Sequence, residues 1–244
     1  MLFRLHIRAC QVVTEIVTLL ENGLADGAMA RWRTLHEIQT VAAFICTHGE
    51  VVASKYVDYQ IIESKRAADL YKVNHAKFGY RPMSKKQATR VDAAFAQMVQ
   101  KHGPLFAEEY GWAADYMKGG RANFAKIEMA VGAAEMRSPY KLASYNVHAS
   151  PKGAFFRIGA IQGSGALLAG HSNAGLTEPA QNCAFSFTKL CLLLPGNSSA
   201  WIMDDIVIGK ILDRLMWEIP GDFWKAEQKL KRDDRRFKKA SKNA

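Results

Sequence analysis

Cysteine is scarce in this chain of 244 residues, which has four cysteines and no Cys-x-x-Cys pair. This scarcity excludes a small scaffold held together by disulfides, and it predicts free thiols in a reducing, cytoplasmic compartment. Long apolar runs are also missing, because no segment approaches the roughly 20 apolar residues that a membrane-spanning helix needs. Charged residues at Arg4, Arg8 and Glu15 interrupt what would be the apolar region of a leader peptide. We therefore expect a soluble protein with no membrane partner.

Several signatures of familiar enzyme classes are absent too. The sequence has no Gly-Lys-Ser/Thr phosphate loop, no Gly-x-Ser-x-Gly turn and no His-Glu-x-x-His zinc motif. The segment 159–175 contains Gly163-Ser164-Gly165, but a dinucleotide fingerprint needs a preceding strand and an acidic residue about 20 residues later. These absences argue against a nucleotide loop, a serine hydrolase and a dedicated zinc site. We expect neither a cofactor nor a metal.

Most of the chain shows the three- and four-residue apolar spacing of amphipathic helices. The expected helices cover residues 2–22, 24–47, 50–74, 85–101, 122–136, 138–149, 179–194 and 200–219. On the first helix, one stripe is predicted to be buried, made of Phe3, Ile7, Cys10, Val13, Val17, Leu20 and Leu24. The fold class is therefore mostly α, a single-domain helical bundle over residues 1–224. Pro220 is expected to end the last helix before a basic C-terminal tail, residues 225–244.

The segment 151–175 departs from this helical pattern because it contains six glycines. Short apolar stretches, 154–161 and 166–169, flank the turn-like sequence Gln162-Gly163-Ser164-Gly165. This arrangement predicts an insertion in the bundle, either a small β-hairpin or a long glycine-rich loop.

Positive charge is concentrated near the C-terminus. Residues 225–244 include nine basic and three acidic residues, so the tail has +6 of the chain's net charge of +10. Such a segment attracts RNA or another polyanion by releasing counterions. The candidate binding residues are Lys229, Lys231, Arg232, Arg235, Arg236, Lys238 and Lys239. The other interpretation is a solvated helix end that keeps the protein soluble. A second positive stretch, residues 51–100, has a net charge of +5.

The densest group of reactive side chains lies in the second expected helix, at Arg31, Arg33, His36 and Glu37. Arg33 and Glu37 are four residues apart and can pair on one helix face, whereas Arg31 and His36 do not converge on a straight helix. In one interpretation, Arg33 and Glu37 form a structural ion pair. In the other, Arg33 stabilises developing negative charge while His36 or Glu37 transfers a proton.

A second group, Ser144-Tyr145-Asn146-Val147-His148, lies near the end of a later helix and beside the glycine-rich segment. His148 is either a histidine that caps the helix, where the dipole favours its charged form, or a site residue together with Tyr145. Ser144 is in mid-helix and not on a strained turn, so we do not expect it to be the nucleophile of a hydrolase.

At these two groups, the sequence resembles a bacterial family catalogued as domain of unknown function 5677. The resemblance rests on Arg33-Thr34-Leu35-His36-Glu37 and on Ser144-x-x-x-His148, and it continues through Pro151-Lys152-Gly153 and the stretch 170–176. It covers residues 23 to about 194. The resemblance implies a helical domain in which Arg33 and Glu37 approach His148, and it implies no assigned activity.

The sequence also resembles the HEPN ribonucleases, helical proteins found in toxins and antiviral defence. Their motif is an Arg followed, after four to six residues, by a His, and Arg31 and His36 fit with four residues between them. Trp32 stands where that family usually has a polar residue. The resemblance implies a homodimer and metal-independent cleavage of RNA.

The leading hypothesis is an RNA-directed nuclease, a toxin or antiviral-defence effector. Arg33 or Arg31 would stabilise the phosphorane, His36 or His148 would act as acid or base, and Glu37 would orient the site. The alternative is a non-catalytic helical module in which Arg33, Glu37 and His148 form a buried structural network and the tail docks on an acidic partner.

Overall fold

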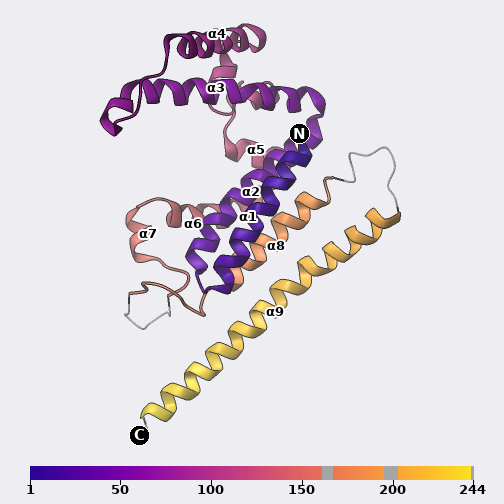
Figure 1. The fold of residues 1–244 in the computed structure, drawn as a ribbon. Coiled ribbons are helices and arrows are strands. Elements are labelled where there is room, and N and C mark those ends of the chain that lie inside the picture. The colour runs from indigo at the N-terminus through magenta and orange to yellow at the C-terminus, as the bar shows by residue number, and fades with distance from the viewer. Residues whose placement is uncertain (161–166, 195–202, 243–244) are drawn as a thin grey trace. The chain divides into compact units, whose positions relative to one another are not determined.

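The computed structural model describes residues 1–160, 167–194 and 203–242, and every regular element within these ranges is helical (Figure 1). The predicted mostly α fold class is thereby confirmed. The residues group into two compact units. We name them by their place in the sequence: the terminal unit is Leu2–Cys46 with Glu135–Ala244, and the middle unit is Thr47–Ala134.

The core of the terminal unit is formed around α2 (Ala25–His48), which lies beside α1 (Leu2–Glu21) and α8 (Thr177–Cys191) (Figure 1). Trp32 and Leu35 of α2 are fully buried. The indole Nε1 of Trp32 donates to Ser186 Oγ of α8 at 2.9 Å, so the largest core side chain also satisfies its polar atom. This packing fixes the position of α2, and with it the face that carries Arg33 and Glu37.

The buried face of α1 differs from the predicted one. The buried residues are Leu5, Ala9, Val12 and Ile16, whereas Phe3 and Ile7 keep 69% and 55% of their area exposed. The prediction of a buried Phe3–Leu24 stripe is therefore wrong for these side chains. Apolar residues occupy two faces of α1, and periodicity alone does not choose between two rows that repeat at helical spacing.

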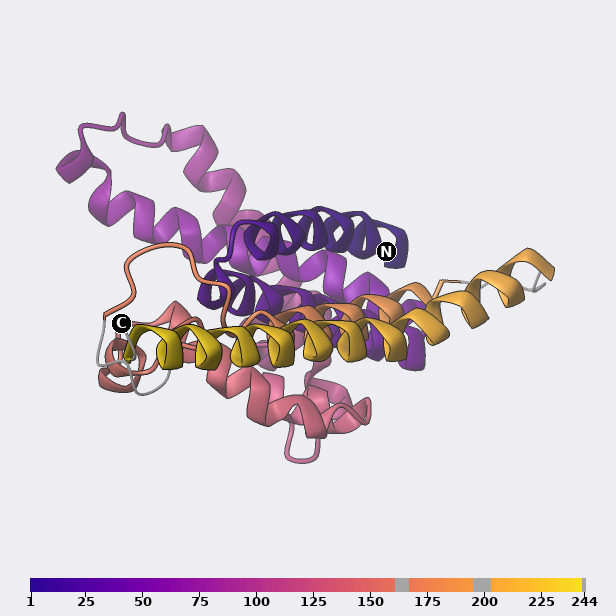
Figure 2. The same cartoon turned by 90° about the horizontal axis from the view of Figure 1, so that it is seen from below.

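The C-terminal helix α9 (Met203–Lys242) runs along α8 (Figures 1 and 2). Met216 is buried, and the rings of Phe185 and Trp217 meet edge to face at 5.5 Å. The prediction that Pro220 ends this helix is wrong, because the helix continues through it. The proline removes one backbone hydrogen bond, and packing against α8 stabilises the helix that remains. The basic residues of 225–242 thus lie on the last part of a helix.

The glycine-rich segment begins with a short helix, α7 (Pro151–Phe155), and its described parts, 151–160 and 167–175, contain no strand. Ser150 caps α7 by accepting from the backbone N–H of Gly153 at 3.2 Å, and Pro151 suits the first helical position. Of the two predicted alternatives, the β-hairpin is therefore wrong in these parts. The predicted turn at 162–165 lies outside the described residues.

The loop after α7 is fastened to the turn between α1 and α2. The carboxylate of Asp26 accepts from the backbone N–H groups of Ile158 and Gly159 at 3.1 and 3.3 Å. The carbonyl oxygen of Asn22 lies 2.6 Å from Nδ1 of His171. These contacts join segments that are more than 130 residues apart in the sequence, and they fix both ends of the glycine-rich loop.

The middle unit is centred on α3 (Glu50–Asn74) and α4 (Lys85–His102), which lie side by side (Figure 1). The helix η1 (His75–Phe78) and a turn join them, and η2 (Pro104–Ala107), η3 (Gly111–Tyr116) and α5 (Phe124–Ala130) follow. Asp58 of α3 contacts Lys101 at 2.7 Å and His102 at 2.8 Å. This polar group ties the two long helices together.

The four cysteines are free thiols. Cys183 of α8 is buried, and this burial raises the pKa of its thiol to about 12. Burial also raises the pKa of Cys191 to about 11, with a smaller contribution from Cys10. Because the thiolate is the reactive form, Cys183 and Cys191 are poor nucleophiles at neutral pH.

Candidate active site

An ion pair on one face of α2 forms the centre of the candidate site. Arg33 Nε lies 3.1 Å from Glu37 Oε1, as the four-residue spacing predicts. The two side chains keep 24% and 37% of their area exposed, although the neighbouring Trp32 and Leu35 are fully buried. The pair is therefore partly open to solvent at the edge of an otherwise buried helix.

Tyr140 of α6 (Arg137–Val147) completes this pair. Its hydroxyl donates to Glu37 Oε1 at 2.5 Å, and the guanidinium carbon of Arg33 lies 4.7 Å from its ring centre. Sequence analysis missed Tyr140. Two spacings in the sequence could have pointed to it, because Tyr140 lies four residues before Ser144 and eight before His148. In the structure, the Ser144 hydroxyl donates to the Tyr140 carbonyl at 2.9 Å.

Electrostatics fix the protonation of these groups. Burial and the nearby Glu37 carboxylate raise the pKa of Tyr140 far above its usual value, so the phenol stays neutral and donates its proton in a hydrogen bond. Burial by itself would lower the pKa of Arg33, but Tyr140 and Glu37 outweigh this effect and raise it. Arg33 is thus a permanent positive charge held in one orientation.

His148 joins the site from the C-terminal end of α6. The residue has left the helix, with φ −109° and ψ 142°, and its side chain is exposed. Its Nε2 lies 3.4 Å from Arg33 Nη1. A guanidinium only donates hydrogen bonds, so this contact is a hydrogen bond in the tautomer that has a lone pair on Nε2 and its ring proton on Nδ1.

Two further cations lie close to these groups. The guanidinium carbon of Arg137 is 5.3 Å from the ring centre of Tyr140, and Lys152 Nζ of α7 is 4.7 Å from the ring centre of Tyr145. A Cβ added at Gly153 would lie 2.2 Å from the Tyr145 carbonyl oxygen, so only glycine lets α7 approach α6 this closely. Arg137 thus adds positive charge beside Tyr140, and partly exposed positive charge favours an anion such as a phosphate group.

The structure does not bring Arg31 and His36 to this cluster in the same way. Arg31 pairs with Glu15 of α1 and donates to Thr34 Oγ1 at 3.3 Å. The imidazole of His36 is fully buried, with the ring of Trp32 at 5.5 Å and that of Tyr140 at 5.7 Å, so it lies beneath the cluster and not on its exposed side. It therefore lacks the access to solvent that a residue acting on RNA requires. Of the predicted site residues, Arg33, Glu37 and His148 meet directly.

The predicted polyanion-binding residues lie on the last turns of α9. The side chains of Lys229, Lys231, Arg232, Arg235, Arg236 and Lys239 are exposed, and Lys231 pairs with Glu227 at 2.7 Å. The side chain of Lys238 lies outside the described part of the chain. Within the described residues, no group of three or more His, Cys, Asp or Glu side chains is placed to hold a metal ion.

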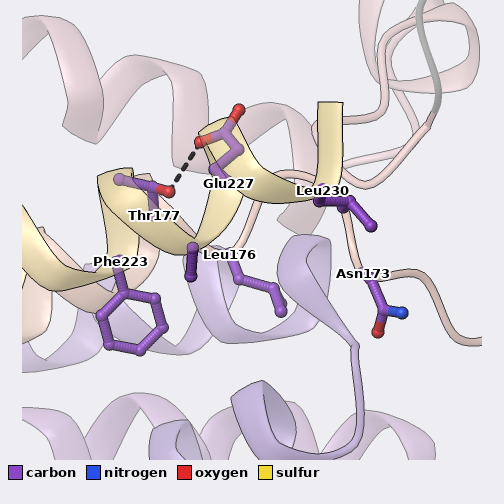
Figure 3. A pocket seen from close by; sticks show the side chains of 7 residues that line it. Asn173, Leu176, Thr177, Phe223, Glu227 and Leu230 are labelled. Carbon is purple, nitrogen blue, oxygen red and sulfur yellow. Dashed lines mark hydrogen bonds between the residues drawn. The ribbon is translucent and has the colours of Figure 1, made fainter. Parts of the chain in front are cut away.

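A cavity of about 280 Å³ lies where the start of α8 faces α9 (Figure 3). Its walls are made of Asn173, Leu176, Thr177, Phe223, Ala226, Glu227 and Leu230. The Thr177 hydroxyl donates to the Glu227 carboxylate at 2.6 Å, and hydrogen bonds from Lys231 and Thr177 lower the pKa of Glu227. A largely apolar cavity with one ionised carboxylate does not suit a phosphate. It is therefore not part of the candidate site around Arg33.

Comparison with known proteins places the cluster within a family. None of the helices in the described ranges combines the length and the apolar character needed to cross a membrane. Searches of curated proteins and of solved structures found no match. A family model described as "Family of unknown function (DUF5677)" matches residues 1–163, which include Arg33, Glu37 and His148. The stretch 170–176 lies beyond this match. Because the match spans about two thirds of the 244 residues, the chain belongs to this family of unknown function, DUF5677.

Proposed function

We propose that this protein is a metal-independent ribonuclease in which His148 accepts a proton and Arg33 binds the phosphate. One observation carries the proposal: the 3.4 Å contact between His148 Nε2 and Arg33 Nη1, with both side chains open to solvent. A proton acceptor beside a fixed positive charge is the combination that cleavage of RNA by its own 2′-hydroxyl requires.

The reaction needs one proton acceptor and one anion-stabilising group. When a phosphate oxygen takes the hydrogen bond of Arg33 Nη1, the lone pair of His148 Nε2 is released. Nε2 then takes the proton of a ribose 2′-hydroxyl, and the oxygen attacks the adjacent phosphorus. Arg33 donates hydrogen bonds to the non-bridging oxygens as negative charge develops there. The bond from phosphorus to the 5′-oxygen breaks, and that oxygen leaves with a proton from water. The products are a 2′,3′-cyclic phosphate and a 5′-hydroxyl, and His148 returns its proton to the hydroxide that remains.

Glu37 and Tyr140 are positioning residues in this proposal. Glu37 holds Arg33 through Nε, so that the Nη groups remain directed toward His148. Tyr140 in turn holds Glu37. Arg137 and Lys152 add positive charge close by, and the basic end of α9 would attract the polyanion by counterion release. The homodimer implied by the HEPN resemblance stays a prediction, which a molar-mass measurement in solution tests.

A second function is favoured by the number of contacts that Arg33 already makes. Its guanidinium contacts Glu37, Tyr140 and His148 within the chain, which is also the pattern of a structural network. In that case the protein is a non-catalytic helical module, and its basic helix end docks on an acidic partner.

The test uses the full chain with a single-stranded RNA, in the presence of EDTA. We expect cleavage that ends in 2′,3′-cyclic phosphates and a substrate with a single 2′-deoxyribose to resist at that position. His148→Ala and Arg33→Lys should each lower the cleavage rate by about a hundredfold or more. The lysine keeps the charge but loses the planar, forked hydrogen bonds.

The matched control is Lys141→Ala, which removes an exposed charge from the same helix and should leave the rate unchanged. Circular dichroism and thermal unfolding confirm that each variant folds. If His148→Ala cleaves RNA as fast as the unaltered protein, or if neither protein cleaves it, the ribonuclease proposal fails and the structural network remains.

A further inference from the structure

The middle unit presents three aromatic rings in one stack where α3 leads into α4. The ring of Tyr80 lies 6.3 Å from that of Tyr71, nearly parallel at 4°, and 5.9 Å from that of Phe78 at 27°. Phe78 and Tyr80 keep 69% and 60% of their area exposed. Large aromatic side chains usually contribute to a core. Two adjacent exposed rings are therefore a candidate surface for binding a ligand or a partner.

Backbone contacts hold these rings in place. Gly79 has φ +69°, in the left-handed region that favours glycine, and the N–H of Tyr80 donates to the His75 carbonyl at 2.9 Å. Together they form the glycine-terminated end of a helix. The hydroxyl of Tyr71 donates to the Arg81 carbonyl at 2.7 Å. The aromatic stack is therefore a fixed platform on a closed turn, and binding does not need to order it.

Two lysines lie beside the rings, at a position in the helix that usually favours acidic residues. Ser84 caps α4, accepting from the N–H of Gln87 at 3.3 Å while its own N–H donates to the Gln87 side chain at 3.1 Å. The next two residues, Lys85 and Lys86, occupy the first turn, where the helix dipole favours acidic residues. Two lysines in this unfavourable position add to the positive end of α4.

The segment that carries these cations contains no negative charge of its own. Residues 71–90 contain six basic residues and no acidic one. Lys72 reaches Asp69 and Asp92 at 3.7 Å. By contrast, four exposed cations form no ion pair with any described residue: Arg81, Lys85, Lys86 and Arg90. The surface thus combines exposed aromatic side chains with positive charge that forms no ion pair among the described residues.

We propose that the aromatic stack of Tyr71, Phe78 and Tyr80, with the cations of residues 77–90, binds a single-stranded nucleic acid. Bases stack on the exposed rings, and the phosphates contact the lysines and arginines. A duplex hides its base faces, so it uses only the cations of this surface, whereas a single strand offers both unstacked bases and phosphates. The proposal goes beyond the ribonuclease and does not depend on it.

The test measures fluorescence anisotropy of the full chain with oligo(dT), oligo(U) and a DNA duplex of equal length. Oligo(dT) has no 2′-hydroxyl and survives even if the chain cleaves RNA, so a change in its affinity between the unaltered chain and a platform variant does not depend on cleavage. The double variant Phe78→Ala/Tyr80→Ala should bind oligo(dT) at least about tenfold more weakly. Lys85→Gln/Lys86→Gln should reduce the slope of log affinity against log salt by about 0.7 for each phosphate that the variant no longer neutralises.

Two matched controls isolate the platform. Phe3 of α1 is as exposed as Phe78, at 69%, and Phe3→Ala should not change binding. Lys118→Gln/Arg121→Gln removes two exposed charges from the same unit and should leave the salt dependence nearly intact. The relative affinities for oligo(dT) and oligo(U) tell whether DNA or RNA is preferred. Equal binding by Phe78→Ala/Tyr80→Ala and the unaltered chain, or equal binding of duplex and single strand, would overturn the proposal.

Discussion

The hydroxyl of Tyr140 donates to the same oxygen of Glu37 that accepts from Arg33 Nε, at 2.5 Å and 3.1 Å. One carboxylate oxygen therefore joins α2 and α6, which are 103 residues apart at this contact. The shared oxygen explains why the exposed His148 meets an arginine in a fixed orientation, because Arg33 has little freedom to turn away.

Replacing Tyr140 by phenylalanine removes the hydroxyl and keeps the ring. We expect Tyr140→Phe to lower the free energy of unfolding by about 1 kcal/mol, at the lower end for a hydrogen bond to a charged group because Glu37 is partly exposed. Urea unfolding measures the change. Tyr145→Phe, on the same helix, removes a hydroxyl that forms no hydrogen bond with a described residue, and it should have a smaller effect.

The stability of the protein should fall at alkaline pH because of Tyr140. Burial and Glu37 raise its pKa in the folded state, whereas an unfolded tyrosine has a pKa of about 10. Below that value both states hold the proton and stability does not change. Above it only the unfolded state loses the proton, so unfolding becomes easier by up to about 1.4 kcal/mol per pH unit. The difference in unfolding free energy between the unaltered chain and Tyr140→Phe should shrink between pH 9 and pH 11.

A methyl group at position 153 should separate α7 from α6. The Cβ would lie 2.2 Å from the Tyr145 carbonyl oxygen and 3.1 Å from that of His148. We expect Gly153→Ala to destabilise the fold by about 1–3 kcal/mol. It should also slow the RNA cleavage that we propose, since the backbone that carries His148 must move. The control is Gly221→Ala in α9, where a Cβ meets nothing within 4 Å. It should raise stability by about 0.5–1 kcal/mol, and equal effects at both sites would contradict the predicted clash.

Removing the proline inside α9 should strengthen that helix. Pro220→Ala restores a backbone donor to the carbonyl of residue 216 and relieves the clash of the ring with the preceding turn. After allowing for the freer unfolded chain, we expect a gain of about 2 kcal/mol in unfolding free energy, seen as a higher midpoint in thermal unfolding. Pro104→Ala, at the start of η2, where a proline is well placed, should give no such gain.

The candidate site was partly predictable because one of its contacts is local. The Arg33–Glu37 pair follows from a four-residue spacing on a helix, and the capping of α4 by Ser84 follows from a short local pattern. Tyr140 was not predictable in this way, since its partner Glu37 is 103 residues away. No local rule connects two residues at that separation.

Two wrong predictions, the buried face of α1 and the helix end at Pro220, have the same origin. Periodicity identified α1 as a helix but selected the row with Phe3 and Ile7, which the structure leaves exposed. The intrinsic preference of Pro220 predicted a helix end, yet contacts with α8 outweigh it and α9 continues. In both cases a packing partner that is distant in the sequence decided the outcome.

The sequence by itself determined the helical fold class, the pairing of Arg33 with Glu37 and the separation of Arg31 from His36, because backbone hydrogen bonds within a helix fix which side chains share a face. Only the tertiary structure decided that His36 is sealed in the core while His148 reaches Arg33, and that Phe78 and Tyr80 remain exposed. Those outcomes depend on which helices pack together, and that choice minimises the free energy of the whole chain at once.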